Sequence, residues 1–108
     1  MYAPADRTAN AGAPQIAVGE SGVWVSFMCD ESVPASKRDW PRDAATVVMH
    51  AATPPNGTAP DFGGGADRIT IAPSPGAMWP AVVSIPGEQR QVVALYSKSG
   101  IAHMVGPL

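Results

Sequence analysis

The sequence predicts an all-β protein built from short antiparallel strands. Its apolar residues fall in short runs, several of which alternate with polar neighbours, and this period of two is typical of strands. The 11 glycines and 12 prolines among the 108 residues separate these runs and favour turns. No segment long enough for an ordinary helix shows a helical period.

A diverged internal repeat indicates the architecture. Residues 14–29 and 80–97 share one outline: a proline, a short apolar run, a turn with Gly and Glu, and a longer apolar run. Their first residues, Pro14 and Pro80, lie 66 positions apart. Such repeats occur in propellers, solenoids and arrays, whose units bury their faces against their neighbours.

The first copy begins with a predicted hairpin. Residues 15–18 are expected to form a short strand, and Gly19 and Gly22 flank a turn in which positive φ is favoured. Residues 23–29 form the strongest predicted strand, because β-branched and aromatic side chains dominate it.

Two more strands follow, each after a long connection. Residues 30–43 form a polar loop that carries much of the charge, and loops of this length are often functional or mobile. Residues 45–52 form the third strand. A second connection, rich in Pro and Gly, spans residues 53–66 and leads to the fourth strand at residues 68–72.

The second copy provides three strands. After a turn-rich crossing segment at residues 73–80, the predicted strands are residues 81–85, 91–97 and 101–105. The turn residues Glu20 and Glu88 match each other in the two copies, which favours a turn role over catalysis.

Seven strands in groups of four and three predict about two antiparallel blades of a β-propeller. The expected single partial domain consists of a flexible arm at residues 1–13, a first blade at residues 14–72 and an incomplete second blade at residues 73–108. A small β-sandwich built from the same strands is the alternative. Because two blades cannot close a ring, we expect either missing propeller blades or copies of the chain itself as partners.

Composition argues against several classes of function. The formal net charge is −2, and the cluster of Lys37, Arg38 and Arg42 is offset by neighbouring aspartates, so nucleic-acid binding is not expected. No apolar stretch approaches the length of a membrane span, so a membrane partner is not expected either. With Cys29 as the only cysteine and no second ligand at metal spacing near either histidine, no metal site and no cofactor are predicted.

Two segments resemble a known family. Residues 25–32 (Val-Ser-Phe-Met-Cys-Asp-Glu-Ser) and 78–85 (Met-Trp-Pro-Ala-Val-Val-Ser-Ile) are similar to blades of sialidase-like β-propeller glycoside hydrolases, closest to the C-terminal blades of fungal-type exo-arabinanases. The resemblance implies a secreted, six-bladed enzyme that removes terminal sugars. A strict aspartate box is absent, and residues 60–66 stand in its place. The family's arginine triad is also missing, which favours arabinan or another neutral glycan over sialic acid.

The candidate site residues lie in the 30–43 loop and the crossing segment. Glycosidases use two carboxyl groups that flank the scissile bond, and Asp30 and Glu31 are the weak catalytic candidates. A solvated loop that ends the strand is the alternative role for this pair. The predicted substrate-binding residues are Trp79, Trp40, Arg42 and Asp43.

The aromatic residues leave alternatives open. An indole can pack against the apolar face of a sugar, and Trp79 could line such a subsite or simply fasten the start of the blade. Trp24 alternates within a strand and is expected to pack between blades. Asn56 begins a glycosylation sequon on an exposed turn.

Three functions are compatible with these patterns. The first is a fragment of a propeller-type, exo-acting glycoside hydrolase that contributes one wall of the substrate cleft. The second is a carbohydrate-binding, lectin-like module that assembles as a homo-oligomeric propeller. The third is a structural remnant without catalysis. Carbohydrate is the expected ligand in the first two cases.

Overall fold

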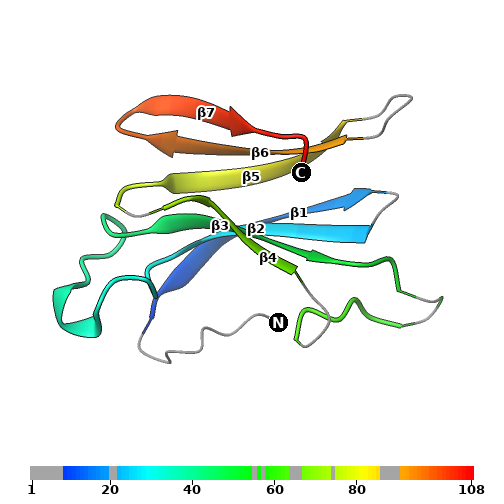
Figure 1. The fold of residues 1–108 in the computed structure, drawn as a ribbon, viewed down its shortest axis with the longest axis horizontal. Coiled ribbons are helices and arrows are strands. Elements are labelled where there is room, and N and C mark those ends of the chain that lie inside the picture. Colours follow the sequence, from blue (N-terminus) through cyan, green and yellow to red (C-terminus); the bar gives the residue numbers. More distant parts are fainter. Residues whose placement is uncertain are drawn as a thin grey trace.

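The computed structural model describes residues 9–19, 22–54, 56, 58–63, 67–73, 75–85 and 91–108. These residues form two antiparallel sheets, which confirms the all-β prediction (Figure 1). The first sheet has the order β1 (Ala11–Gly19), β2 (Gly22–Cys29), β3 (Ala45–Ala51) and β4 (Asp67–Ala72). The second sheet has the order β5 (Met78–Ile85), β6 (Gln91–Lys98) and β7 (Ile101–Val105). One turn of 3₁₀ helix, η1 (Ala35–Lys37), lies in the connection between β2 and β3.

Both copies of the repeat begin earlier than predicted, and for the same reason. β1 starts at Ala11, inside the expected arm, and β5 starts at Met78. The pairing register shifts between Gly12 and Gln15 in β1, and between Met78 and Ala81 in β5. A proline cannot donate to the ladder and is tolerated at a bulge, so pairing continues on both sides of it.

The repeat therefore extends to the local backbone conformation. Ala13 has a φ of 53° and Trp79 has a φ of 55°, and each precedes the proline of its bulge. These two residues are separated by the same 66 positions as Pro14 and Pro80. The turn residues Glu20 and Glu88, like the first eight residues of the expected arm, lie outside the described residues.

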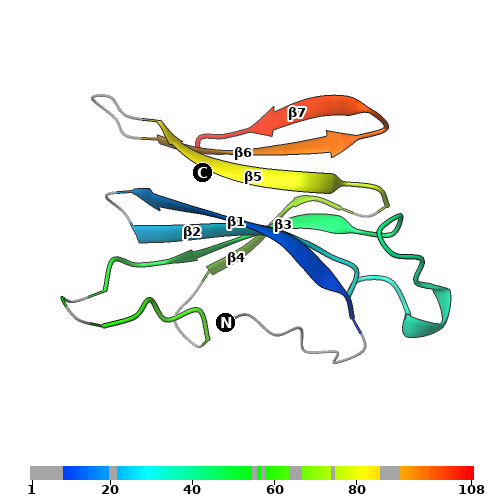
Figure 2. The same cartoon turned by 180° about the vertical axis from the view of Figure 1, so that it is seen from behind.

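The second sheet lies along one face of the first, with β5 beside β1 and β2 (Figures 1 and 2). A shared core fills the space between the two sheets. The first sheet contributes Ala17, Trp24 and Val48, and the second contributes Val82, Val92 and Ala94. Trp24 thus packs between the two repeat units, as the alternation in its strand predicted.

The opposite face of the first sheet is covered in part by the connection between β3 and β4. Phe27, Cys29, Val47 and Met49 are buried there, and Phe62 of the connection packs against them. The long Pro- and Gly-rich segment is thus a cover for β2 and β3, because it supplies an apolar side chain to a sheet face.

A substitution in the first hairpin tests how closely β2 approaches β3. Gly22 has a φ of 140°, and a Cβ atom added there would collide with the carbonyl oxygen of Ala51. We expect Gly22→Ala to lower the free energy of unfolding by about 2–3 kcal/mol, because backbone strain and overpacking add. Gly100→Ala is the matched control: its φ is 76°, but the added Cβ meets open space, so a loss of about 1 kcal/mol is expected. Urea denaturation measures both losses in the free energy of unfolding. Equal losses for the two variants would contradict the close approach of Gly22 to Ala51.

Candidate functional site

The candidate site lies at the end of the first sheet where β2 ends and β3 begins. The segment before β5 is joined to this end by two hydrogen bonds: the Ala77 N–H donates to the Ala44 carbonyl (3.2 Å), and the Thr46 hydroxyl donates to the Ala77 carbonyl (3.3 Å). The structure therefore brings the start of β5 against the end of the 30–43 loop.

Trp79 occupies the bulge at the start of β5. Its amide N–H donates to the Met28 sulfur at 3.4 Å, which places its backbone over β2. Its side chain is 67% exposed. A bulky residue with positive φ is a backbone outlier, and strain of this kind clusters at functional sites. Because the equivalent bulge in β1 is formed by Ala13, the bulge itself does not require an indole.

Trp40 lies at the same end, over the neighbouring strand. A Cβ atom placed on Gly12 would lie 3.4 Å from Cζ2 of Trp40, so the ring lies within van der Waals distance of this position in β1. Gly12 pairs directly with Met28, and paired residues face the same side of a sheet. Trp40 and the backbone of Trp79 are thus anchored at adjacent positions on one face, and part of each indole is exposed.

Arg42 and Asp43 lie in a turn of the same loop. The Asp43 carboxylate accepts the Asp39 amide N–H at 2.8 Å, and the Asp43 N–H donates back to the Asp39 carbonyl at 3.0 Å. The Arg42 guanidinium lies 3.2 Å from the Asp39 carboxylate and is largely exposed. Both remain candidates for polar contacts with a ligand beside the two tryptophans.

Asp30 is completely buried and is held by the fold. Its Oδ1 accepts the Asn10 amide N–H at 2.6 Å, and its Oδ2 accepts the Asn10 side-chain amide at 2.9 Å. The Arg38 Nε lies 3.7 Å from Oδ1 and donates to the Asp30 carbonyl at 3.1 Å. The alternative of a solvated carboxylate is therefore wrong for Asp30, and its interactions are those of a structural group that ties the start of β1 to the loop.

Glu31 has a different partner. Its Oε1 pairs with the Arg68 guanidinium on β4, and its Oε2 is buried without a hydrogen-bond partner among the described residues. Asp30 is bound to Asn10 and Arg38, whereas Glu31 reaches across the sheet. The two carboxylates therefore do not converge on one exposed point.

Sequence reasoning missed Gly12, Met28 and Asn10 as parts of this end of the molecule. A signal for Gly12 was present, because it precedes Pro14 by the same two positions that separate Met78 from Pro80. Only knowledge of the register could reveal that Gly12 faces Met28. Asn10 lay in the expected arm, where no pattern connects it to Asp30.

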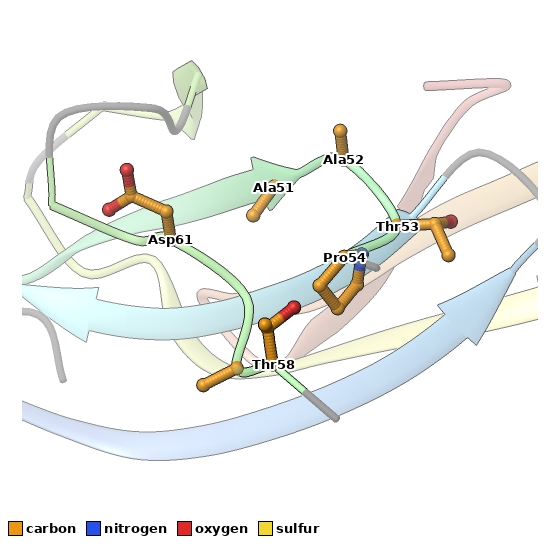
Figure 3. A pocket seen from close by; sticks show the side chains of 7 residues that line it. Ala51, Ala52, Thr53, Pro54, Thr58 and Asp61 are labelled. Atoms are coloured by element: carbon orange, nitrogen blue, oxygen red, sulfur yellow. The ribbon is translucent and has the colours of Figure 1, made fainter. Parts of the chain in front are cut away.

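A separate open hollow of about 230 Å³ lies at the opposite end of β3 (Figure 3). Its lining is mostly small and apolar, with one carboxylate: Ala51, Ala52, Thr53, Pro54, Thr58, Ala59 and Asp61. Asp61 also accepts the Gly63 amide N–H at 2.9 Å, which closes a local turn. None of the predicted substrate-binding residues lines this hollow.

The sequon at Asn56 can be tested directly. Asn56 is exposed in the connection between β3 and β4, where an attached glycan would point into solvent. On expression through a eukaryotic secretory pathway, we expect the chain to gain one N-glycan and to lose it on treatment with a glycosidase that cleaves N-glycans. Asn56→Gln and Thr58→Ala should each abolish the mass shift, and a shift that persists in both variants would place the glycan elsewhere.

No protein-family model matches the chain, no curated protein matches its sequence and no solved structure matches its fold. The resemblance to sialidase-like propellers therefore stays a prediction. In the part of the chain that the structure describes, no helix is long and apolar enough to cross a membrane. Within the same residues, no three His, Cys, Asp or Glu side chains come close enough to hold a metal ion.

Proposed function

We propose that the chain is a carbohydrate-binding unit whose two sheets are successive blades of a β-propeller. The observation that carries this proposal is Trp79: a large, exposed indole on a left-handed backbone, where the first copy of the repeat has alanine. An exposed tryptophan that contributes little to the core at a strained position is well explained by contact with a ligand.

The surroundings of Trp79 suit a neutral sugar. Trp40 supplies a second partly exposed ring on the same face, and Arg42 and Asp43 supply hydrogen-bonding groups nearby in the sequence. Flat aromatic faces bind the C–H faces of sugars, and a few polar groups orient the hydroxyls. The resemblance to exo-arabinanases makes arabino-oligosaccharides the first ligands to test, and it implies a secreted location.

The propeller is favoured over the β-sandwich by the arrangement of the two sheets. Each sheet is a meander whose strands follow in chain order, which is the topology of a blade. The matching bulges and the shared core indicate two units stacked in the same orientation.

Binding is favoured over hydrolysis by this chain alone. A glycosidase needs two carboxyl groups about 5–9.5 Å apart that both reach the scissile bond. Asp30 is buried under Asn10 and Arg38, and Glu31 is paired with Arg68. If the chain contributes one wall of an exo-acting cleft, which is the second candidate function, the catalytic carboxylates come from other blades.

Tryptophan fluorescence and calorimetric titration with arabino-oligosaccharides test the proposal. We expect Trp79→Ala to weaken binding at least tenfold, because buried aromatic contacts dominate such sites. Stability should change by less than about 1 kcal/mol, since alanine already occupies the equivalent bulge at position 13. Trp79→Phe should keep part of the affinity.

Ile101→Ala, which alters an exposed side chain on β7, is the control and should bind like the wild type. Equal affinity of Trp79→Ala and the wild type would overturn the proposed site. Failure of the wild-type chain to bind any of a panel of neutral oligosaccharides would overturn the function.

A further inference from the structure

The repeat gives each sheet two unlike faces. At the shift of 66 positions, Ile16 in β1 corresponds to Val82 in β5, and Ala17 corresponds to Val83. Ala17 and Val82 are 8% and 5% exposed, because they meet in the core between the sheets. We call the face that carries Ile16 or Val82 the leading face, and the face that carries Ala17 or Val83 the trailing face.

Inside the chain, the trailing face of the first sheet packs against the leading face of the second. The leading face of the first sheet and the trailing face of the second lie at the outside, and each is covered only in part, since Val93, the partner of Val83, is itself buried. Ile16 is 67% exposed on the leading face of the first sheet, and Val83 is 43% exposed on the trailing face of the second. Val18 is also exposed on the face of Ile16, and we call these two residues the first strip. Ile85 is exposed on the face of Val83, and these two residues form the second strip.

The cover supplied by Phe62 does not remove the first strip. Phe62 packs against the cluster on β2 and β3, whereas Ile16 and Val18 lie on the edge strand β1. Val25, directly paired with Ile16, joins this strip to the covered part of the face. The exposed side chains of Ile16 and Val18 are thus continuous with the apolar cluster on β2 and β3 against which Phe62 packs.

We propose that a second copy of this chain docks head to tail, with its leading face on the trailing face of the first copy. The contact between the two sheets inside the chain shows that a leading face of this sequence fits a trailing face. In the intermolecular contact, Ile16 would take the place of Val82, and Val83 would take the place of Ala17. The low charge of the chain, with a net charge of −2, opposes such stacking only weakly.

A contact between unlike faces is heterologous, so it forms a ring if the rotation closes. Three copies supply six sheets, and a closed trimer of the 11.1-kDa chain has a mass of about 33 kDa. This inference concerns the partner of the sheet faces and holds or fails independently of sugar binding at Trp79.

Sedimentation equilibrium of the full chain and of blocked variants tests the inference. We expect about 33 kDa for the wild type, and Ile101→Glu, an exposed β7 change outside both strips, should behave like it. Val18→Glu blocks the leading face and Val83→Glu blocks the trailing face, so each variant alone should sediment as a monomer.

Mixing the two variants gives the decisive measurement. Each has one intact face of the opposite kind, so an equimolar mixture should form a dimer of about 22 kDa and no larger species. A mixture that stays monomeric would overturn the head-to-tail contact, as would a monomeric wild type at millimolar concentration. If circular dichroism shows that Val83→Glu does not fold, Ile85→Glu blocks the same strip.

Discussion

Replacement of Asp30 by alanine is expected to lower the free energy of unfolding by about 3–5 kcal/mol, because it takes the carboxylate away from a buried cation and removes two hydrogen-bond acceptors. The Arg38 side chain, itself almost fully buried, would lose the carboxylate 3.7 Å from its Nε. The Asn10 amide N–H and side-chain amide would lose both of their acceptors. For a domain with a total stability of about 5–15 kcal/mol, this loss is a large share.

Urea denaturation followed by far-UV circular dichroism measures this effect. Asp30→Asn keeps the shape and one acceptor, so we expect an intermediate loss. Asp39→Ala is the matched control: Asp39 is an exposed partner of Arg42 in the same loop, and its loss should cost less than about 1 kcal/mol. If Asp30→Ala lost no more stability than Asp39→Ala, the buried network would not be the structural tie that its geometry indicates.

A double-mutant cycle separates the two halves of this network. If Asp30 and Arg38 interact directly, the combined variant Asp30→Ala with Arg38→Ala should be more stable than the sum of the single losses predicts. Additive losses would mean that Asp30 acts mainly through Asn10, whose two hydrogen bonds to the carboxylate are the shorter contacts.

Local sequence patterns were sufficient to predict all seven strands and their two groups. Alternating apolar residues and glycine turns are short-range signals, and the same short-range chemistry decides where strands form and where they reverse. The starts of β1 and β5 were placed too late, since Pro14 and Pro80 marked a boundary in the pattern. In three dimensions each proline lies at a bulge, and pairing resumes before it.

The site shows where such patterns stop being informative. The sequence identified Trp79 and residues 30–43 as candidate parts of one site. It could not predict the burial of Asp30, because the partner Asn10 lies 20 positions away in a segment without periodic pattern. Acidic residues in a charged loop are usually solvated. Here Asp30 is enclosed, because the backbone amide of Asn10 and the side chain of Arg38 reach its carboxylate.

Replacement of Trp24 by alanine is the second change with a large expected effect, a loss of about 3–5 kcal/mol in the free energy of unfolding. Trp24 lies in the core between the sheets and stacks on His50, with ring centroids 4.1 Å apart. Trp40→Ala, which truncates a partly exposed indole, should cost clearly less. Trp24→Phe should cost less than alanine, since the buried indole Nε1 has no hydrogen-bond partner among the described residues.

Hydrogen exchange in Trp24→Ala would show whether the two sheets are one cooperative unit. Trp24 touches the second sheet through the cluster that contains Val82, Val92 and Ala94. If the sheets stabilise each other through this core, amides of β5 and β6 should lose protection together with those of β2, although the substitution lies in the first sheet. Protection lost in β2 alone would mean that the second sheet is stable without the first. In that case the leading and trailing faces would make a weak contact inside the chain, and a strong contact between copies through the same kind of faces would not be expected.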